Sequence, residues 1–158
     1  MEKKKPLIIF IGNPLFKDDK IGLMIGEKLR ESLLNIGYDV EIADKTGLNL
    51  VDYLEGREEV VIVDSITASG YQIGEIVELD IDSLSSYTIW SPHYIGVPEA
   101  FKIMEILELN PPKKLYILGI KVSDVYTISE ELSEELQDKL DIIVEEIYHK
   151  ILKLLKRL

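Results

Sequence analysis

The chain has 158 residues, of which 46% are apolar, enough for one domain with a hydrophobic core and too many for a disordered protein. Its net charge of −11 argues against a nucleic-acid partner, which would be bound through Lys and Arg at the phosphates. The absence of cysteine excludes disulfides, thiolate metal sites and cysteine nucleophiles. No segment has the ~20 apolar residues of a membrane span. We therefore expect one cytoplasmic domain over residues 1–158, and the richness in Ile, Glu and Lys suggests a thermophilic source.

Continuous apolar runs at residues 6–12, 59–64 and 114–120 predict strands that are buried on both faces of a parallel sheet. The alternating pattern of residues 38–43 predicts an edge strand. Between Asp64 and the next strand, residues 75–79, there is no room for a helix, whereas a parallel return needs about a dozen residues or more. Residues 75–79 should therefore run antiparallel, at or near a sheet edge.

Amphipathic periodicity predicts helices between these strands and after the last one. They cover residues 21–36, 49–54, 97–109 and 136–155. Strands that alternate with helices indicate a mostly parallel sheet with helices on both faces. The expected fold is a single-domain three-layer α/β/α sandwich with about five strands, one of them antiparallel.

Two adjacent acids, Asp18 and Asp19, precede the first predicted helix. A structural role would suffice for both, since Asp is a good N-cap and an acid favours the helix dipole. Asp64 ends a buried strand, at the sheet edge where ligands bind in open α/β folds. Its alternative role is to cap the following loop by accepting hydrogen bonds from the amides of residues 65–67.

The chain has two histidines, and they lie in different contexts. His149 lies in the terminal helix and is expected on the surface. His93 lies in a loop bounded by Pro and Gly, where functional side chains concentrate, although it could be incidental to a helix entry.

Asp19, Asp64 and His93 together make a plausible divalent-metal site. Imidazole and oxygen ligands suit nickel, zinc, cobalt or manganese, and three protein ligands leave positions for water or substrate. The phosphate-binding fingerprints, the nucleophile elbow and the zinc-binding His-Glu-x-x-His helix are absent. Ser65 and Ser69 lie near the proposed site in sequence, so a serine nucleophile stays an alternative.

Four segments, in their order and approximate spacing, carry a resemblance to one family, the hydrogenase maturation proteases. They are the turn Gly12-Asn13-x-Leu15-x-x-Asp18-Asp19-x-x-Gly22, the strand end Val63-Asp64 with Gly74-Glu75-Ile76 after it, the loop Ser91-Pro92-His93-Tyr94-Ile95-Gly96, and Gly119-Ile120 followed by Leu132-Ser133-Glu134-Glu135. The family usually has Gly where this chain has Lys20, and often Pro after the serine corresponding to Ser133.

The resemblance implies a twisted mixed sheet between helical layers and an aspartyl-type, metal-dependent endopeptidase. Such proteins remove a C-terminal extension from the large-subunit precursor of a [NiFe] hydrogenase after nickel insertion. By carry-over, Asp19, Asp64 and His93 are both the metal contacts and the catalytic residues. The nickel belongs to the substrate as a recognition tag, and zinc or cadmium could replace it in the isolated protein.

Two other functions stay open at this stage. The chain could be a non-enzymatic, metal-binding maturation chaperone for the same substrate. It could also be a hydrolase of the same fold with another protein target, such as a relative of spore-type proteases. The sequence does not set the oligomeric state, for which a monomer is our expectation.

Overall fold

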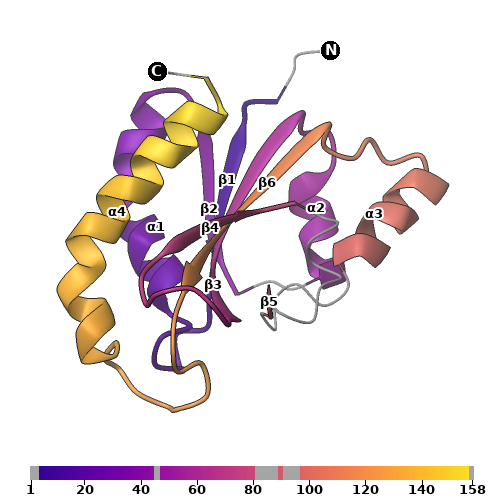
Figure 1. Ribbon diagram of the computed structural model, residues 1–158. Coiled ribbons are helices and arrows are strands. Elements are labelled where there is room, and N and C mark those ends of the chain that lie inside the picture. Colours follow the sequence, from indigo (N-terminus) through magenta and orange to yellow (C-terminus); the bar gives the residue numbers. More distant parts are fainter. Residues whose placement is uncertain (1–3, 45–46, 81–88, 91–96, 157–158) are drawn as a thin grey trace.

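The computed structural model describes residues 4–44, 47–80, 89–90 and 97–156, and Figure 1 shows them as a three-layer sandwich. A central sheet lies between two helical layers, as the alternation of strands and helices predicted. The predicted metal contact His93 lies outside the described residues, as do residues 81–88.

Five strands form the main path of the sheet, in the order β2-β1-β3-β6-β4. Their bounds are Leu7–Ile11 for β1, Asp39–Ala43 for β2, Glu59–Ala68 for β3, Ile76–Leu79 for β4 and Lys114–Lys121 for β6. The pairs β1–β2, β1–β3 and β3–β6 are parallel, and β2 lies at an edge as predicted. The fold class predicted from the sequence is confirmed.

The edge strand β4 pairs with β6 in the antiparallel direction, with Ile76 opposite Ile120 and Leu79 opposite Ile117. This confirms the orientation expected from the short connection after β3. A two-residue strand, β5 (Ile89–Trp90), also pairs antiparallel with the end of β3.

The helices cover both faces of the sheet. Helices α1 (Ile21–Asn35) and α4 (Glu134–Leu154) pack on one face, where their apolar stripes join one core cluster. The 3-10 helix η1 (Gly47–Leu50), α2 (Val51–Leu54) and α3 (Val97–Ile106) lie on the other face and help to bury a second cluster. Gly37, which follows the C-cap residue Ile36 of α1, has a positive φ of 100°, a conformation that is common for glycine just after a helix.

The strand β3 is longer than its apolar run predicted, because it continues beyond Asp64 to Ala68. The extension pairs with β6 through Asp64–Gly119, Ser65–Ile120 and Ile66–Lys121. Its partner on the other side ends earlier, since the ladder between β1 and β3 stops at Phe10 opposite Val63. The expectation that Asp64 ends its strand is therefore wrong, and Asp64 lies within β3 where the β1 ladder has ended.

Gly22, in the first turn of α1, lets this helix begin directly against the carboxyl end of β1. A Cβ atom built on Gly22 would lie 2.1 Å from the carbonyl oxygen of Ile11 and 3.3 Å from that of Val63. Both contacts are with backbone atoms, so no side-chain rotation could relieve them. A side chain at position 22 would therefore force α1 away from the sheet edge that carries the candidate site.

We predict that Gly22→Ala lowers the free energy of unfolding by about 3 kcal/mol, because the added methyl overpacks a backbone contact. Urea denaturation followed by circular dichroism measures this change. Glu27→Ala, on the exposed face of the same helix, is the control and should change stability by less than about 0.5 kcal/mol. Equal stability of the two variants would show that α1 can move without loss.

Candidate functional site

The carboxylate of Asp19 is held from two directions at the start of α1. The hydroxyl of Ser65 donates a hydrogen bond to Asp19 Oδ1 at 2.6 Å. The backbone amide of Asn13 donates to Asp19 Oδ2 at 3.1 Å. Asp19 and Ser65 are both buried, so these hydrogen bonds replace contacts with water that the carboxylate has lost.

Asp64 is fully buried on the neighbouring strand, one residue before Ser65. The amide of Ser65 donates a hydrogen bond to Asp64 Oδ1 at 2.7 Å. The loop-capping role considered for Asp64 is thus partly confirmed, although the amide belongs to a strand residue. Ser65 contacts both candidate acids, one through its hydroxyl and the other through its backbone.

The two acids approach the sheet edge from opposite faces. Side chains alternate along a strand. Val63 joins the core under α1 and α4, whereas Ile62 and Ile66 join the core under α2 and α3. By this alternation Ser65 faces α1 and Asp64 faces the α2–α3 layer. Ser65 therefore contacts one acid on each face of the sheet, Asp19 through its hydroxyl and Asp64 through its backbone amide, beyond the end of the β1 ladder.

This point is the topological switch of the sheet. The neighbouring strands β1 and β3 are followed by connections that cross opposite faces of the sheet. After β1 the chain continues through α1 on one face, and after β3 it reaches β6 through α3 on the other face. In open α/β sheets, the crevice beyond the carboxyl ends at such a point is the usual ligand site. The expected placement of Asp19 and Asp64 at one rim of the sheet is confirmed.

Asp18 has a different role from the N-cap that its position suggested. The N-cap of α1 is Lys20, without a side-chain hydrogen bond. Asp18 Oδ1 instead accepts from the amide of Ser133 at 2.8 Å, and Oδ2 accepts from the Ser133 hydroxyl at 2.7 Å. Oδ2 also accepts from the amide of Asp124 at 3.0 Å and from the hydroxyl of Ser123 at 3.3 Å. Asp18 therefore fixes the start of α4 rather than that of α1.

Backbone hydrogen bonds join the β1–α1 loop to the β6–α4 loop beside it. The amide of Lys17 donates to the Thr127 carbonyl at 2.7 Å, and the amide of Ser129 donates to the Leu15 carbonyl at 3.1 Å. Asp124 shapes the second loop, and hydrogen bonds from the hydroxyl and amide of Thr127 hold the pKa of its carboxyl below the ordinary value. The two loops form one connected structure next to Asp19.

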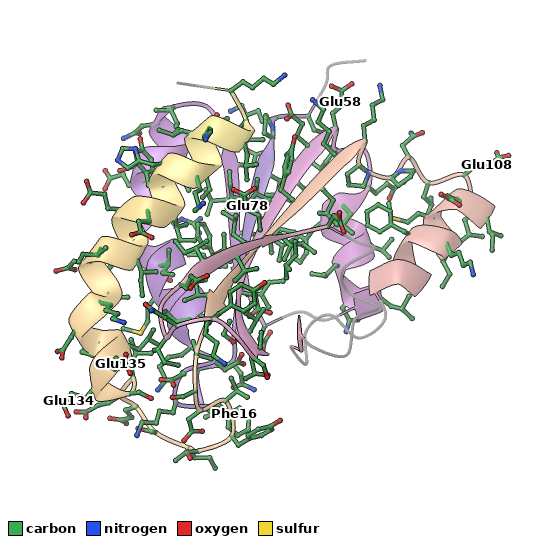
Figure 2. The ribbon with its side chains drawn as sticks, in the orientation of Figure 1. Phe16, Glu58, Glu78, Glu108, Glu134 and Glu135 are labelled. Carbon is green, nitrogen blue, oxygen red and sulfur yellow. The ribbon has the colours of Figure 1, made fainter. Side chains whose placement is uncertain are left out.

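These loops carry three large apolar side chains that are open to solvent, here called the apolar platform: Leu15, Tyr126 and Ile128, exposed by 61%, 72% and 76%. Phe16 and Ile128 form an antiparallel bridge that sets their backbones side by side. Phe16 is labelled at the lower edge of the molecule in Figure 2. The platform adjoins the site through Asn13, whose amide is bonded to Asp19.

Lys20 stands where the resembled family usually has Gly, and it does not strain the backbone of the turn. Lys20 has φ −73° and ψ −8°, an ordinary helical conformation that does not require glycine. Its buried ammonium group donates a hydrogen bond to the carbonyl of Ser129. Lys20 thus adds a further link between the two loops that lie beside Asp19.

Within the described ranges no three His, Asp or Glu side chains converge as metal ligands. His93 is not among these residues, so the three-ligand site stays a prediction. His149 is exposed on α4 and lies 3.8 Å from Glu145, which agrees with its expected surface position. No helix in the described part of the chain is long and apolar enough to cross a membrane.

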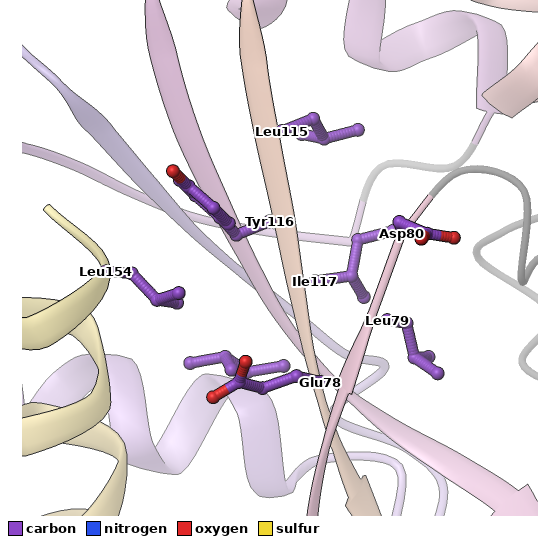
Figure 3. Close-up of a pocket in the computed structure, with 8 residues that line it drawn as sticks. Glu78, Leu79, Asp80, Leu115, Tyr116, Ile117 and Leu154 are labelled. Carbon is purple, nitrogen blue, oxygen red and sulfur yellow. The ribbon is translucent and has the colours of Figure 1, made fainter.

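A cavity of about 330 Å³ lies elsewhere, beside β4, β6 and the end of α4. Figure 3 shows this cavity, which is lined by Glu78, Leu79, Asp80, Leu115, Tyr116, Ile117, Leu118 and Leu154. The β6 residues in this lining precede Gly119, the residue that pairs with Asp64. Neither Asp19 nor Asp64 lines this cavity, so it does not contain the candidate site.

Two buried carboxylates thus lie at the switch point of an α/β sheet, where ligands usually bind. The family model of the hydrogenase maturation proteases matches residues 25–150, and the chain belongs to this family. A Methanocaldococcus jannaschii protein assigned by name, provisionally, to the same family is 29% identical over 97% of this chain and 100% of its own length.

Solved structures of the family show the same fold. The hydrogenase maturating endopeptidase HybD of Escherichia coli matches with a TM-score of 0.72 at 21% identity, covering 94% of this chain and 93% of its own. The [NiFe] hydrogenase maturation protease HybD of Thermococcus kodakarensis matches with a TM-score of 0.70 at 28% identity, covering 93% and 98%. The chain is thus a peptidase-family domain, as its sequence motifs predicted.

We predict that Asp18→Ala lowers the free energy of unfolding by about 2–4 kcal/mol, because it leaves the amides of Ser133 and Asp124 without their acceptor. Urea denaturation measures the change, with Asp52→Ala on the exposed side of α2 as the control. If Asp18→Ala were as stable as the wild type, the hydrogen bonds of Asp18 would not be needed to fix the start of α4.

Proposed function

We propose that this protein is an endopeptidase that removes the C-terminal extension of a [NiFe] hydrogenase large-subunit precursor after nickel insertion. Membership of the maturation protease family supplies the reaction class. The observation that carries the site assignment is the 2.6 Å hydrogen bond from the Ser65 hydroxyl to Asp19 Oδ1, which places Asp19 beside the residue that follows Asp64 at the carboxyl edge of the sheet.

In this proposal nickel is part of the substrate and is coordinated by Asp19, Asp64 and His93. Carboxylate oxygen and imidazole nitrogen suit nickel, and zinc or cadmium could take its place in the isolated protein. The pairing of β5 supports the inclusion of His93. Trp90, three residues before His93 in the chain, lies opposite Thr67, three residues after Asp64.

Hydrolysis of the peptide bond adds water across it, so the attacking water loses a proton and the leaving nitrogen gains one. Asp19 and Asp64 are the groups that we assign to this proton transfer, as general acid–base residues. Recognition of nickel would bring the scissile bond to the same rim. Cleavage would then be restricted to a precursor that already holds its metal.

We predict that the enzyme shortens a nickel-loaded precursor and leaves the nickel-free precursor intact, as measured by mass spectrometry of the large subunit. Asp19→Asn, Asp64→Asn and His93→Ala should each lower the cleavage rate by about 10²-fold or more, because each removes a metal contact or proton carrier. Asp52→Asn, an exposed acid on α2, is the control and should cleave normally.

Two outcomes would contradict the proposal. Binding of the loaded precursor without shortening would indicate a maturation chaperone. Equal cleavage of nickel-free precursor or of casein-like proteins would indicate a hydrolase with another target. Unfolding curves for every variant separate loss of the site from loss of the fold.

We further propose that the apolar platform contacts the precursor beside the cleavage point. A protein substrate must lie against the surface next to the reacting groups, and the platform adjoins Asp19 through the Asn13 amide. Its backbone is held by the bonds between the two loops, so little ordering is needed when a partner binds. Exposed apolar side chains gathered at such a position are typical of a protein contact.

We predict that the double variant Leu15→Ser/Ile128→Ser raises KM for the loaded precursor about tenfold or more and leaves kcat unchanged, because it removes apolar contact area away from the reacting groups. The matched control is Leu107→Ser/Ile106→Ser at the end of α3, whose side chains have the same exposures of 61% and 76%. Steady-state cleavage measures both. Equal effects of the two pairs, or none, would place the contact elsewhere.

A further inference from the structure

Ser65 is the residue that links the two candidate acids, and neither its motif nor the family resemblance assigns it a role. Its hydroxyl donates to Asp19 Oδ1 at 2.6 Å, and its amide donates to Asp64 Oδ1 at 2.7 Å. It is buried within β3, at the position where β6 pairs with it and β1 no longer does.

The position of Ser65 does not suit a serine nucleophile. In a nucleophile elbow, the serine stands on a sharp strand-to-helix turn that exposes its oxygen to substrate. Ser65 instead lies inside a continuous strand with its side chain buried. Its hydroxyl hydrogen points to a carboxylate of the proposed metal-binding pair. The geometry is that of a group that holds Asp19.

We propose that Ser65 is a positioning residue that fixes the orientation of the Asp19 carboxylate for metal contact, an inference that rests on the proposed function. The Ser65 hydroxyl holds one carboxylate oxygen and the Asn13 amide holds the other, so rotation of the carboxylate is restrained at both ends. A carboxylate has about four lone-pair sites, so each oxygen keeps capacity for a further ligand. Restraint of this kind presents the same oxygens to each incoming metal.

The two hydrogen bonds of Ser65 can be separated by substitution. Ser65→Ala removes the hydroxyl and with it the restraint on Asp19 Oδ1. The backbone amide remains, so the hydrogen bond to Asp64 Oδ1 should persist. The variant therefore tests the orientation of one acid while the other acid and the strand are left in place.

The matched control is Ser123→Ala. Its hydroxyl donates to Asp18 Oδ2 at 3.3 Å, so the same substitution removes a serine–carboxylate hydrogen bond from the adjacent, structural acid. Ser65→Thr is the conservative variant, since threonine keeps a hydroxyl that can donate to Asp19. Unfolding by urea, measured for all three, gives the cost to the fold.

The experiment titrates Ni²⁺ into the isolated full-length proteins by calorimetry and measures cleavage of the nickel-loaded precursor. Loss of a hydrogen bond that orients a metal-ligating side chain typically weakens metal affinity or activity by about 10–100-fold. We expect a loss of this size for Ser65→Ala in both Ni²⁺ affinity and kcat, with little change in KM. Ser123→Ala should keep wild-type affinity, and Ser65→Thr should recover most of the loss.

Unchanged Ni²⁺ affinity in a folded Ser65→Ala variant would overturn the proposal. If cleavage were abolished at unchanged affinity, Ser65 would be a nucleophile instead. Equal losses in Ser65→Ala and Ser123→Ala would indicate a general effect on the fold. The affinity readout does not need precursor cleavage, so the proposed function can fail while the positioning role of Ser65 is still judged.

Discussion

The candidate site depends on β3 extending further than its neighbour β1. The ladder between them stops at Val63, whereas β3 continues to Ala68 against β6. Beyond that point one side of β3 lacks the β1 ladder, and the Ser65 amide is satisfied by the Asp64 side chain. The start of α1 fits over the end of β1 because Gly22 has no side chain. These two constraints bring Asp19 to Ser65.

The burial of Asp19 and Asp64 has no evident advantage for stability. A carboxylate loses favourable hydration when it is buried, and even a compensated buried charge seldom stabilises a fold more than an apolar group would. Asp18, next to Asp19 in sequence, differs in this respect. Its hydrogen bonds to Ser133 and Asp124 connect α4 to the rest of the molecule, so a structural role accounts for it.

In the proposed function, the apolar platform and the buried acids have different roles. The acids lie inside the sheet edge and suit a small, charged target such as a metal centre and its adjacent peptide bond. The platform residues lie on the surface of two connected loops and present an apolar contact surface to a protein partner. They are Leu15, Tyr126 and Ile128. A catalyst that must select one protein in one metal-loaded state needs both kinds of contact.

Much of this arrangement could be predicted from the sequence, because it follows from local rules. Apolar runs predicted β1, β3 and β6, and the short connection after Asp64 predicted the antiparallel β4. The motifs placed Asp19 and Asp64 at one rim, and the structure confirms that placement. The position of His93 stays a prediction.

Other features depend on tertiary contacts that local patterns do not encode. The extension of β3 through polar Ser65 and Thr67 requires pairing with β6 and β5. The role of Asp18 was misassigned because its partner Ser133 lies 115 residues away, and a local capping rule favoured α1. The link from Ser65 to Asp19 likewise spans 46 residues and exists only once α1 packs on the sheet.

The central claim is that Asp19 and Asp64 grip one metal ion together with His93. Anomalous diffraction at the nickel edge, from crystals soaked with Ni²⁺, tests this claim most directly. The account predicts a single strong peak between the two carboxylates, with the His93 imidazole completing the contacts at bond lengths of about 2.0–2.2 Å, as for zinc. A peak bound elsewhere, or a nickel ion at the rim with His93 turned away from it, would contradict the account.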